Sequence, residues 1–439
     1  MSKSEISRRK FLGRSGTAAL ALPLAAAIPA AIEATSPKAV KAASMEDTLQ
    51  LLPNRTLTSR TIGSTTVTIP IANLPSDGTS DASGAIQSEI NNLPTGGGTI
   101  IIPWQNTGGS QCVYMINTQA RTDAGGNDCA INMKSNVRLE CQPGVKLQAI
   151  TANTGSTKTD RAYMISCNGI NNVEIANCWL VGERYTHVYS SGTSTDEHYY
   201  GISISNVTGM NIRATQISDC TGDGLCLGGS PSDIVLCDVL STGNRRQAIS
   251  ITSGTNIHLY DSEFSYTSGT LPMDGIDIEP QGSASVNGVT IENCIIKGNG
   301  GCGIQLNAQG TNISNVNVVN CLVSYNEWNG FIAQMGTTKA GAVGTITTGT
   351  IYGSAFFQNG QEGVSLSGTT SNYTVGDTTK GDANSNSFAN NKLRLPNDIQ
   401  YPNPTEADTS GYVSGNDMFV SSNSLSSGTV VHWNTYYTP

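Results

Sequence analysis

The chain contains little charge, few aromatic side chains and little histidine. Of its 439 residues, 13% are Asp, Glu, Lys or Arg, 6% are aromatic and four are His. This composition, rich in Gly, Asn, Ser and Thr, excludes coiled coils and mainly helical bundles. The 24 basic residues are outnumbered by 33 acidic ones, which argues against a nucleic-acid partner because phosphate binding needs clustered Lys and Arg. The hydrophobic fraction of 37% is nevertheless enough for a large core.

Cysteine patterns typical of metal sites are missing too. The eleven cysteines include no C-x-x-C pair and no Cys/His pairing of zinc spacing, so no metal site is expected. Cys178, Cys294 and Cys321 occupy the same place in a repeat described below and are expected to be small core residues. If a disulfide forms, the best candidates are among Cys112, Cys129 and Cys141, which lie outside that repeat.

Long apolar runs are missing except near the N-terminus. A twin-arginine pattern, Ser7-Arg8-Arg9-Lys10-Phe11-Leu12-Gly13, precedes an apolar run from Thr17 to Ile32 and a small-residue site at Val40-Lys41-Ala42. We therefore predict that residues 1–42 are an export signal read by the Tat machinery and then removed, with an uncut signal anchor as the alternative. The expected location is periplasmic or secreted, in a bacterium, with no membrane span after processing. Residues 1–42 hold seven of the 24 basic and two of the 33 acidic residues, so the remaining chain carries a net charge of −14.

A repeat runs through the middle of the chain. Two alternating apolar residues, a polar residue or Asn, a small inward residue and a turn recur at Val173, Met210, Ile234, Ile257, Val289, Val316 and Gly349. A second alternating strand follows each time, beginning at Gly201, Gly224, Ala248, Gly275, Gly303, Gly330 and Gly363. The glycines are expected to supply special backbone angles at a tight corner. Strands that repeat in register predict parallel sheets stacked about 4.8 Å apart, which is a β-solenoid.

A solenoid needs covered ends, because open strand edges invite pairing with other chains. After Asp81, the residues Ile86, Ile90 and Leu93 form the stripe of a short amphipathic helix, which Pro94 and three glycines stop. The predicted organisation is an export signal (1–42), an N-terminal segment with a capping helix (43–98), a parallel β-helix (99–395) and an irregular C-terminal cap (396–439).

The residues from Asp81 to Pro103 (DASGAIQSEINNLPTGGGTIIIP), followed by Lys134-Ser-Asn-Val-Arg-Leu, resemble the opening of the pectate-lyase superfamily. The resemblance implies an all-β fold, a single-stranded right-handed parallel β-helix, and a carbohydrate-active protein. It does not imply one reaction, since that superfamily includes lyases, hydrolases, epimerases and phage tailspikes. The polygalacturonase signatures (Asn-Thr-Asp, Asp-Asp, Gly-His-Gly, Arg-Ile-Lys) and the Asp-Pro-His of mannuronan epimerases are absent, so no catalytic residue is carried over.

Acidic residues gather in the aligned coils. The column just before the second strand reads Tyr200, Asp223, Gln247, Asp274, Cys302, Asn329 and Glu362. The column pointing outward from that strand reads Ser203, Cys226, Ser250, Asp277, Gln305, Ile332 and Ser365, and the next outward column contains Ser205, Gly228, Thr252, Glu279 and Asn307. We predict a catalytic cluster of Asp223, Asp274, Asp277 and Glu279, although Asp before Gly is also a common turn residue.

Basic and aromatic residues surround this cluster. Arg245 and Arg246 lie in a turn between the acidic columns, where they can hold carboxylates or clamp a sugar substituent, or simply face solvent. His198, a titratable group, ends the longest insertion at this corner, Glu183 to Tyr200. The predicted sugar-binding residues are Tyr185, Tyr189, Tyr199, Tyr200, Gln247, Gln305 and Trp328.

Three functions fit this pattern. Glycoside hydrolysis needs two carboxyl groups, here Asp277 with Asp274 or Asp223, and no cofactor; it is favoured for the acidic chain acting on a neutral glycan. A lyase or uronan epimerase would use Arg245, Arg246 and His198, with Ca²⁺ held by the acids. A non-catalytic glycan-binding or surface β-helix is the third. In each case the expected partner is a polysaccharide or oligosaccharide, and a homo-oligomer is compatible with the sequence.

Overall fold

The computed structural model describes residues 55–106, 111–152, 161–189, 196–334, 344–366, 370–376, 386–389, 391, 418–420, 430–431 and 435–437. The predicted export signal and most of the predicted C-terminal cap lie outside these residues. Among the described residues, no helix is long and apolar enough to cross a membrane.

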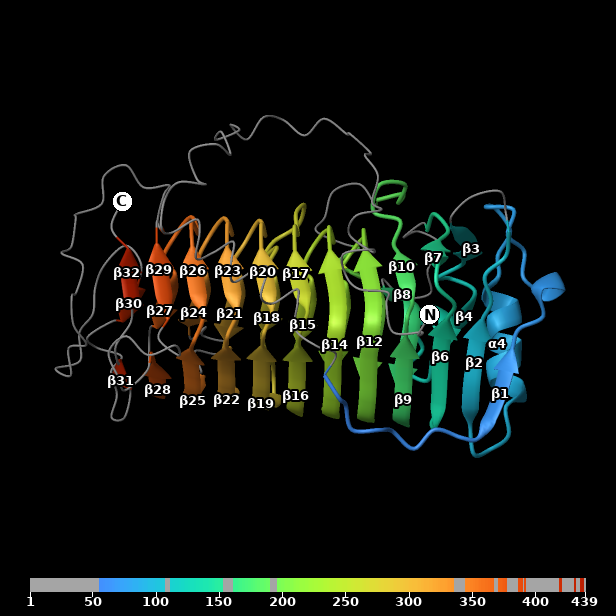
Figure 1. Ribbon diagram of the computed structural model, residues 1–439, viewed down its shortest axis with the longest axis horizontal. Coiled ribbons are helices and arrows are strands. Elements are labelled where there is room, and N and C mark those ends of the chain that lie inside the picture. The colour runs from blue at the N-terminus through green and yellow to red at the C-terminus, as the bar shows by residue number, and fades with distance from the viewer. Residues whose placement is uncertain are drawn as a thin grey trace, which may run out of the picture. The chain divides into compact units, whose positions relative to one another are not determined.

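One sheet collects the second strand of every coil (Figure 1). All its pairings are parallel except that between its first two members, β4 and β5. Its strands are β4 (Arg121–Thr122), β5 (Asp128–Asn132), β8 (Arg161–Asn168), β11 (His198–Ser205), β13 (Leu225–Gly228), β15 (Ile249–Ile251), β18 (Ile276–Ile278), β21 (Ile304–Asn307), β24 (Phe331–Gln334), β27 (Val364–Leu366) and β30 (Met418–Val420).

The other strands form two parallel ladders that share the long strands β12 (Thr208–Ser218) and β14 (Ser232–Thr242). The first ladder comprises β1 (Thr65–Thr68), β2 (Gly98–Ile102), β6 (Val137–Cys141), β9 (Asn171–Ala176), β12, β14, β16 (Gly254–Tyr260), β19 (Ser285–Glu292), β22 (Asn312–Val319), β25 (Thr345–Tyr352), β28 (Ser371–Val375) and β31 (Val430–Val431). The second comprises β3 (Cys112–Ile116), β7 (Val145–Ala149), β10 (Trp179–Val181), β12, β14, β17 (Glu263–Ser265), β20 (Ile295–Lys297), β23 (Leu322–Ser324), β26 (Ala355–Phe357), β29 (Ser387–Ala389) and β32 (Thr435–Tyr437). The predicted parallel β-helix is therefore confirmed.

The corner between the two ladders is a single residue with left-handed backbone angles. In stacked coils this residue is Asn177, Ala214, Asp238, Asp261, Asn293, Asn320 and Gly353, all with positive φ. Asn, Asp and Gly tolerate that conformation better than other residues, which explains the recurrent Asn in the sequence repeat. The residue after the corner turns inward, so Cys178, Cys294 and Cys321 are fully buried as predicted.

The glycines before the second strand have a different role from the one expected. None of the six at positions 201, 224, 275, 303, 330 and 363 has a positive φ, so the prediction of special backbone angles is wrong. Space explains them instead: a Cβ on Gly303 would lie 2.6 Å from the Gly330 carbonyl oxygen, and one on Gly330 would lie 2.5 Å from that of Gly363. At these glycines the next coil leaves no room for a Cβ, whereas Ala248 is accommodated at the equivalent position of its own coil.

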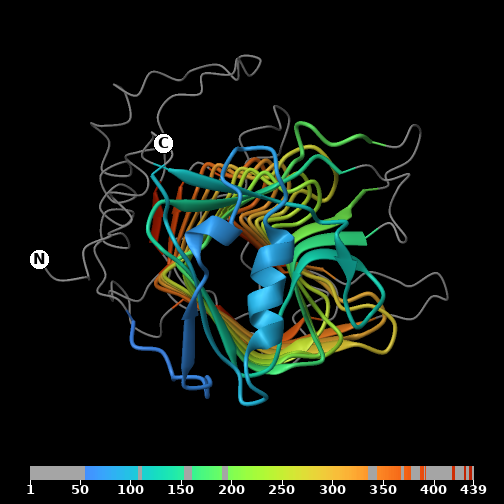
Figure 2. The same ribbon diagram turned by 90° about the vertical axis from the view of Figure 1, so that its right-hand side faces the viewer.

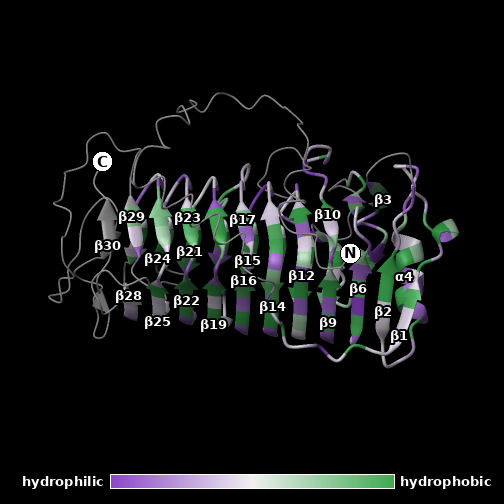
Figure 3. Cartoon of the chain, viewed as in Figure 1, coloured by the Kyte–Doolittle hydropathy of each residue, from purple (hydrophilic) through white to green (hydrophobic). Residues whose placement is uncertain are grey.

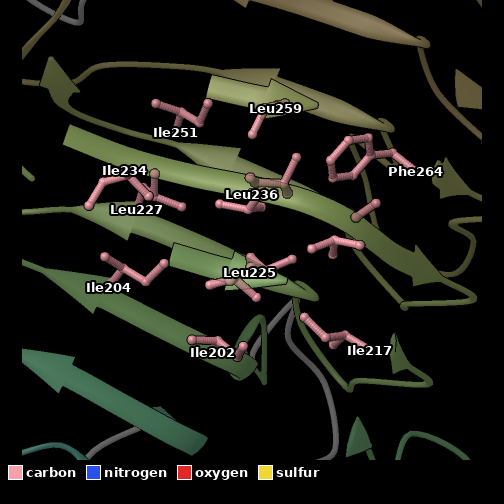
Figure 4. Packing of buried hydrophobic residues seen from close by; sticks show 14 of the residues in the cluster. Ile202, Ile204, Ile217, Leu225, Leu227, Ile234, Leu236, Ile251, Leu259 and Phe264 are labelled. Atoms are coloured by element: carbon pink, nitrogen blue, oxygen red, sulfur yellow. The ribbon is translucent and has the colours of Figure 1, made fainter. Parts of the chain in front are cut away.

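The core lies inside the coils and is formed by stacked aliphatic columns. Along the strands, hydrophobic and hydrophilic residues alternate, as the colouring of Figure 3 shows. Figure 4 shows Ile202 and Leu225 pointing into the same interior as Leu236 and Leu259 from the opposite side. These side chains are fully buried, and burial of such columns is the main stabilising contribution.

The proposed disulfide candidates are free thiols. Cys112, Cys129 and Cys141 are all buried and form no disulfide with one another. Cys141 instead contacts Cys178 of the next coil, with 3.0 Å between the Sγ atoms. In this part of the chain, cysteine serves as a small apolar core residue.

A ladder of buried asparagines holds the turn that leads into the eleven-stranded sheet. Asn299, Asn326, Asn359 and Asn391 occupy successive coils, and the Nδ2 of each of the first three donates to the Oδ1 of the next at 2.8–2.9 Å. Each of the four also donates to a backbone carbonyl of the preceding coil. Because every buried amide is satisfied, this turn is fixed rather than free to move.

The N-terminal end of the coil stack is covered as predicted. Helix α4 (Ser83–Asn92) lies across the end of the coils in Figure 2, after strand β1 and the short 3-10 helix η1 (Ile71–Asn73). Ile86 and Ile90 are fully buried, whereas Leu93 is only partly buried just after the helix. Asp81 accepts a hydrogen bond from the Ser83 N–H at 2.8 Å at the helix start, and Pro94 follows the helix end.

An N-terminal strap, residues 55–63, runs along the outer face of the first ladder (Figure 1). Arg60 is its best-buried anchor: it pairs with the Asp233 carboxylate and donates to Asn211 Oδ1 at 2.9 Å and to the Met210 carbonyl at 3.3 Å. Arg55 binds Glu292 at 2.7 Å, several coils further on. The strap therefore joins coils that do not follow one another in sequence.

We expect Arg60→Ala to lower the free energy of unfolding by about 1–3 kcal/mol. The side chain is only 5% exposed, so its removal leaves buried acceptors without charge-assisted hydrogen bonds. Chemical denaturation of the full chain measures the change. Arg213→Ala is the control, because Arg213 is 33% exposed in its ion pair with Glu174 and should contribute less than about 1 kcal/mol. Equal losses would contradict a special role for the strap.

Candidate functional site

The strand register places the predicted columns side by side. In the outward column, Ser203 pairs with Cys226, Cys226 with Ser250, Ser250 with Asp277 and Asp277 with Gln305. The acidic residues therefore lie on the outer face of the eleven-stranded sheet, around β13, β15 and β18. Although they face outward, the carboxyl groups are buried, with exposed fractions of 0% for Asp223, 0% for Asp274 and 1% for Asp277.

Asp277 is held by an amide on each side. The Gln247 amide nitrogen donates to Oδ2, and Gln305 Nε2 donates to Oδ1 at 3.3 Å. Gln247 Oε1 already accepts from Arg246 at 2.7 Å, and Gln305 Oε1 accepts from Gln334 at 3.0 Å. Both amides are thus oriented with their donors toward Asp277, an arrangement suited to the ionised carboxylate. Burial and the neighbouring Glu279 nevertheless raise the pKa of Asp277 to about 7.

Asp274 has a different environment on the same coil. Its Oδ1 accepts the Cys302 N–H at 2.5 Å, while Oδ2 is buried and has no hydrogen-bond partner among the described residues. Burial, followed by the charge of Asp277, raises the pKa of Asp274 well above its ordinary value. The neutral acid form of Asp274 is therefore favoured more strongly than that of an ordinary carboxyl group.

Asp223 is paired with a guanidinium. Arg246 Nη1 lies 3.2 Å from both carboxylate oxygens, and the Ser250 hydroxyl donates to Oδ2 at 2.6 Å. Burial raises the pKa of Asp223, and Arg246 opposes that effect. Burial alone would lower the pKa of Arg246, but Asp223 and its other anionic neighbours raise it above its usual range. Arg246 is therefore a fixed cation and a poor base.

Glu279 and Trp328 lie beside this network. Glu279 Oε1 accepts from Asn307 at 3.0 Å and from Gln309. Trp328 is partly exposed, in the turn that leads into β24. Neither makes a hydrogen bond to the Asp277 group among the contacts of the described residues.

The aromatic and histidine side chains of the insertion before β11 form two groups. Tyr200 stacks on Tyr163, with ring centroids 5.4 Å apart, and His198 meets Tyr200 edge-on at 6.0 Å. Tyr199 and Tyr189 instead flank His187, at 4.7 and 4.6 Å between centroids. Among these tyrosines, Tyr199 and Tyr200 are 4% and 6% exposed.

Arg245 points to the second group, away from the carboxylates. Its guanidinium carbon lies 4.8 Å from the Tyr189 ring centroid, and Nη1 donates to the Thr221 carbonyl at 3.3 Å. Tyr185, 78% exposed, packs against Arg184 at 5.0 Å. Of the two arginines predicted to serve the acids, the structure brings only Arg246 to them.

A buried acid–histidine cluster was missed in the sequence. His187 Nδ1 lies 2.9 Å from Glu183, its Nε2 lies 3.8 Å from Asp196, and Thr221 donates to Glu183 at 2.7 Å. The spacing of four residues between Glu183 and His187 was the available signal. Across the part of the chain that the structure describes, no three His, Cys, Asp or Glu side chains are arranged to hold a metal ion.

A family model described as "Right handed beta helix region" matches residues 162–347. With the parallel coils described above, this match fixes the hand of the fold. The chain is a right-handed parallel β-helix protein. The chain is also 31% identical over 133 residues to the uncharacterized protein YclG of Bacillus subtilis (strain 168), an alignment that covers 26% of this chain and 22% of YclG. It thus matches about a fifth of that relative's length.

Several solved structures share the β-helix fold at low identity. An endo-xylogalacturonan hydrolase from Aspergillus tubingensis is 11% identical with a TM-score of 0.49, over 74% of this chain and 88% of that one. A mannuronan C-5 epimerase module from Azotobacter vinelandii is 14% identical with a TM-score of 0.42, over 83% and 98%. A tailspike from Acinetobacter baumannii bacteriophage Fri1, a capsular polysaccharide depolymerase, is 14% identical with a TM-score of 0.45, over 70% and 58%. These likenesses concern the fold alone.

We expect the stability of this β-helix to fall with rising pH because of Asp277. A folded pKa of about 7 lies above the ordinary value of 3.8, so the neutral acid is stabilising below pH 4 and that contribution is lost as pH rises through about 7. The free energy of unfolding of Asp277→Asn, relative to that of wild type, should therefore rise by on the order of 1–4 kcal/mol between pH 4 and pH 8. Denaturant unfolding at pH 4, 6 and 8 measures the difference.

The control for this experiment is Asp77→Asn, in an exposed loop. Hydrogen bonds from Ser80, followed by Thr79, lower the pKa of Asp77. The difference in free energy of unfolding between Asp77→Asn and wild type should therefore stay constant between pH 5 and pH 8. A flat profile for Asp277→Asn as well would show that Asp277 ionises normally.

Proposed function

We propose that this protein is an exported carbohydrate-active enzyme that hydrolyses glycosidic bonds of a polysaccharide, with Asp274 and Asp277 as its two carboxyl groups. The observation that carries the proposal is the contrast between two buried carboxyl groups three residues apart on one coil. Asp274 has one buried oxygen without a hydrogen-bond partner among the described residues and a strongly raised pKa, whereas Asp277 accepts hydrogen bonds on both oxygens. Such a contrast assigns the acid and the base of a hydrolase.

In this mechanism Asp274 is the general acid. Burial and the nearby Asp277 oppose its ionisation and raise its pKa, and it protonates the leaving glycosidic oxygen. Asp277 acts as base or nucleophile, aligned by the amides of Gln247 and Gln305. Arg246 and Asp223 hold Gln247 in place and do not touch the sugar.

Substrate contact requires access to Asp277, which is 1% exposed. A productive polysaccharide must therefore displace whatever covers the outer face of β18. Exclusion of water from the occupied site would strengthen the electrostatic effect of the carboxylate on the developing positive charge of the sugar.

Two other functions are distinguished by their products. Elimination or epimerisation would need Arg245, Arg246 or His198 as base and Ca²⁺ or an arginine at the uronate carboxylate. The engagement of Arg246 with Asp223 and Gln247 argues against that role. A non-catalytic glycan-binding β-helix would lose no more than binding when the acids are removed.

We expect Asp277→Asn and Asp274→Asn each to reduce hydrolysis by roughly 10²- to 10⁴-fold, because each removes one half of the acid–base pair. A panel of polysaccharides is assayed for new reducing ends and for the ultraviolet absorbance of an unsaturated uronate. Ser365→Ala, in the same outward column four coils beyond Ser250, is the control and should remain active. Full activity of both acid variants would refute hydrolysis, and ultraviolet absorbance would establish elimination instead.

We expect kcat/KM of the wild-type enzyme to rise with pH up to about 7. Asp277 must be ionised to act, and its pKa is about 7, whereas burial and the charge of Asp277 raise the pKa of Asp274 well above its ordinary value and so favour the acid form. Initial rates between pH 4 and pH 9 on the best substrate measure the profile. A rate that is flat between pH 5 and pH 8 would be inconsistent with Asp277 as the base.

A further inference from the structure

Two tyrosines stand in a backbone conformation that bulky residues avoid. Tyr266 and Tyr325 have φ of 56° and 57°, in the left-handed region that favours glycine and short polar residues. Their exposed fractions are 55% and 54%. Core packing therefore does not explain why large aromatic rings occupy these positions, and strained residues on a rigid scaffold are often functional.

Both tyrosines belong to one column at the entrance of the turn that leads into the eleven-stranded sheet. In successive coils the column reads Asp219, Gly243, Tyr266, Gly298, Tyr325 and Gln358, all with positive φ. Backbone hydrogen bonds fix this register: the Tyr266 N–H donates to the Lys297 carbonyl and the Tyr325 N–H to that of Phe357, both at 3.1 Å. The two tyrosines are thus two coils apart, roughly 9–10 Å along the axis.

The glycine between them determines how the Tyr266 ring lies. A Cβ on Gly298 would stand 2.6 Å from both Cδ1 and Cε1 of Tyr266. The ring therefore lies against the backbone of the next coil, on the side toward Tyr325. Since more than half of its surface is exposed, the side away from Gly298 faces solvent. A flat, exposed aromatic face is the surface on which a sugar ring stacks.

The turns that carry the two tyrosines are rigid. Tyr266 is followed by Thr267 and Tyr325 by Asn326, each 1% exposed. Thr267 donates to Asn299 Oδ1 at 3.0 Å, and Asn299 donates to Asn326 at 2.8 Å. The asparagine ladder thus ties the two turns together, and little ordering is needed before a ligand binds.

The charge of these turns restricts the ligand. Residues 266–275, 298–303, 325–330 and 358–363 contain no Lys or Arg, whereas Asp274, Glu327 and Glu362 are acidic. Two cations, Arg184 and Arg245, lie beside Gly269, and Arg184 already donates to the Ser268 carbonyl. Because Glu327 and Glu362 add negative charge to the turns themselves, an uncharged glycan is favoured over an anionic one. Tyr266 and the proposed acid Asp274 are the two ends of one turn, so a glycan chain bound on the rings lies on the turn that carries the proposed acid.

We propose that Tyr266 and Tyr325 form an aromatic rail that binds an uncharged polysaccharide through the faces of sugar rings two coils apart. Trp328, partly exposed in the same turn as Tyr325, extends the rail toward the eleven-stranded sheet. The choice of a polysaccharide rests on the proposed function, but binding to the rail requires no turnover.

Binding of the full chain to soluble uncharged polysaccharides, a β-glucan, a xylan, a galactomannan and a glucomannan, is measured by affinity gel electrophoresis. We expect Tyr266→Gly and Tyr325→Gly each to weaken binding by roughly three- to tenfold, and the double variant by at least tenfold. Glycine suits the backbone at both positions, so thermal unfolding should show that the fold is kept. Tyr266→Phe, which retains the ring face, should bind as wild type.

The matched control is Gln358→Gly, which makes the same backbone change in the same column without removing a ring and should leave binding unchanged. Unaltered binding of the folded double variant, or failure of the wild-type protein to bind any of the uncharged polysaccharides, would overturn the rail. The Asp277→Asn variant, assayed for new reducing ends, separates the two proposals. If this variant hydrolyses normally while the tyrosine variants bind weakly, the proposed role of Asp277 in hydrolysis is refuted and the aromatic rail is supported.

Discussion

The ladder of backbone hydrogen bonds between successive coils is the constraint on which the rest of the structure depends. Each strand pairs in register with its equivalent in the next coil, so equivalent residues stand about 4.8 Å apart along the axis. Each side chain must therefore pack against the equivalent side chains of the coils before and after it. Aliphatic columns satisfy this requirement inside the coils, and buried asparagines satisfy it at the turn, because an amide can donate to the next amide and accept from the previous one.

Carboxylates tolerate such stacking poorly, because like charges in adjacent coils repel at short range. The acidic columns are accordingly interrupted. Gln247 stands between Asp223 and Asp274 in one column, and Asp277 stands between Ser250 and Gln305 in the other. The interposed amides separate the charges and orient them at the same time, since each amide has one donor and one acceptor end. The proposed acid–base pair depends on this interleaving as much as on the acids themselves.

The stacking rule also determines how much could be read from the sequence. The register from Val173 through Gly349 and the outward position of Asp277 follow from the repeat alone, and the pairings confirm them. The reason for the glycines did not follow, because the distance between Gly303 and the Gly330 carbonyl is a property of packed coils and not of local backbone angles. The direction of Arg245 was equally hidden: neighbouring residues of one turn point to different sides, and only Arg246 reaches Asp223. The burial of Asp277 was hidden as well, because an outward position in a repeat predicts an exposed side chain, and this carboxylate is 1% exposed.

Positions that break the column rule are the most informative ones in a repeat, because local consistency is expected wherever only stability is at stake. Most left-handed positions in the described part of this chain are filled by Asn, Asp and Gly, with Ala214 and Gln358 among the exceptions. Tyr266 and Tyr325 depart from that choice in the one column that borders the turn of Asp274, and a glycine between them makes room for a flat ring. Stability would favour glycine or asparagine at both positions, so the aromatic rings require a cause outside the fold. Binding of a ligand that stacks on the exposed ring faces explains the two tyrosines. The backbone hydrogen bonds between coils set the distance between the two rings.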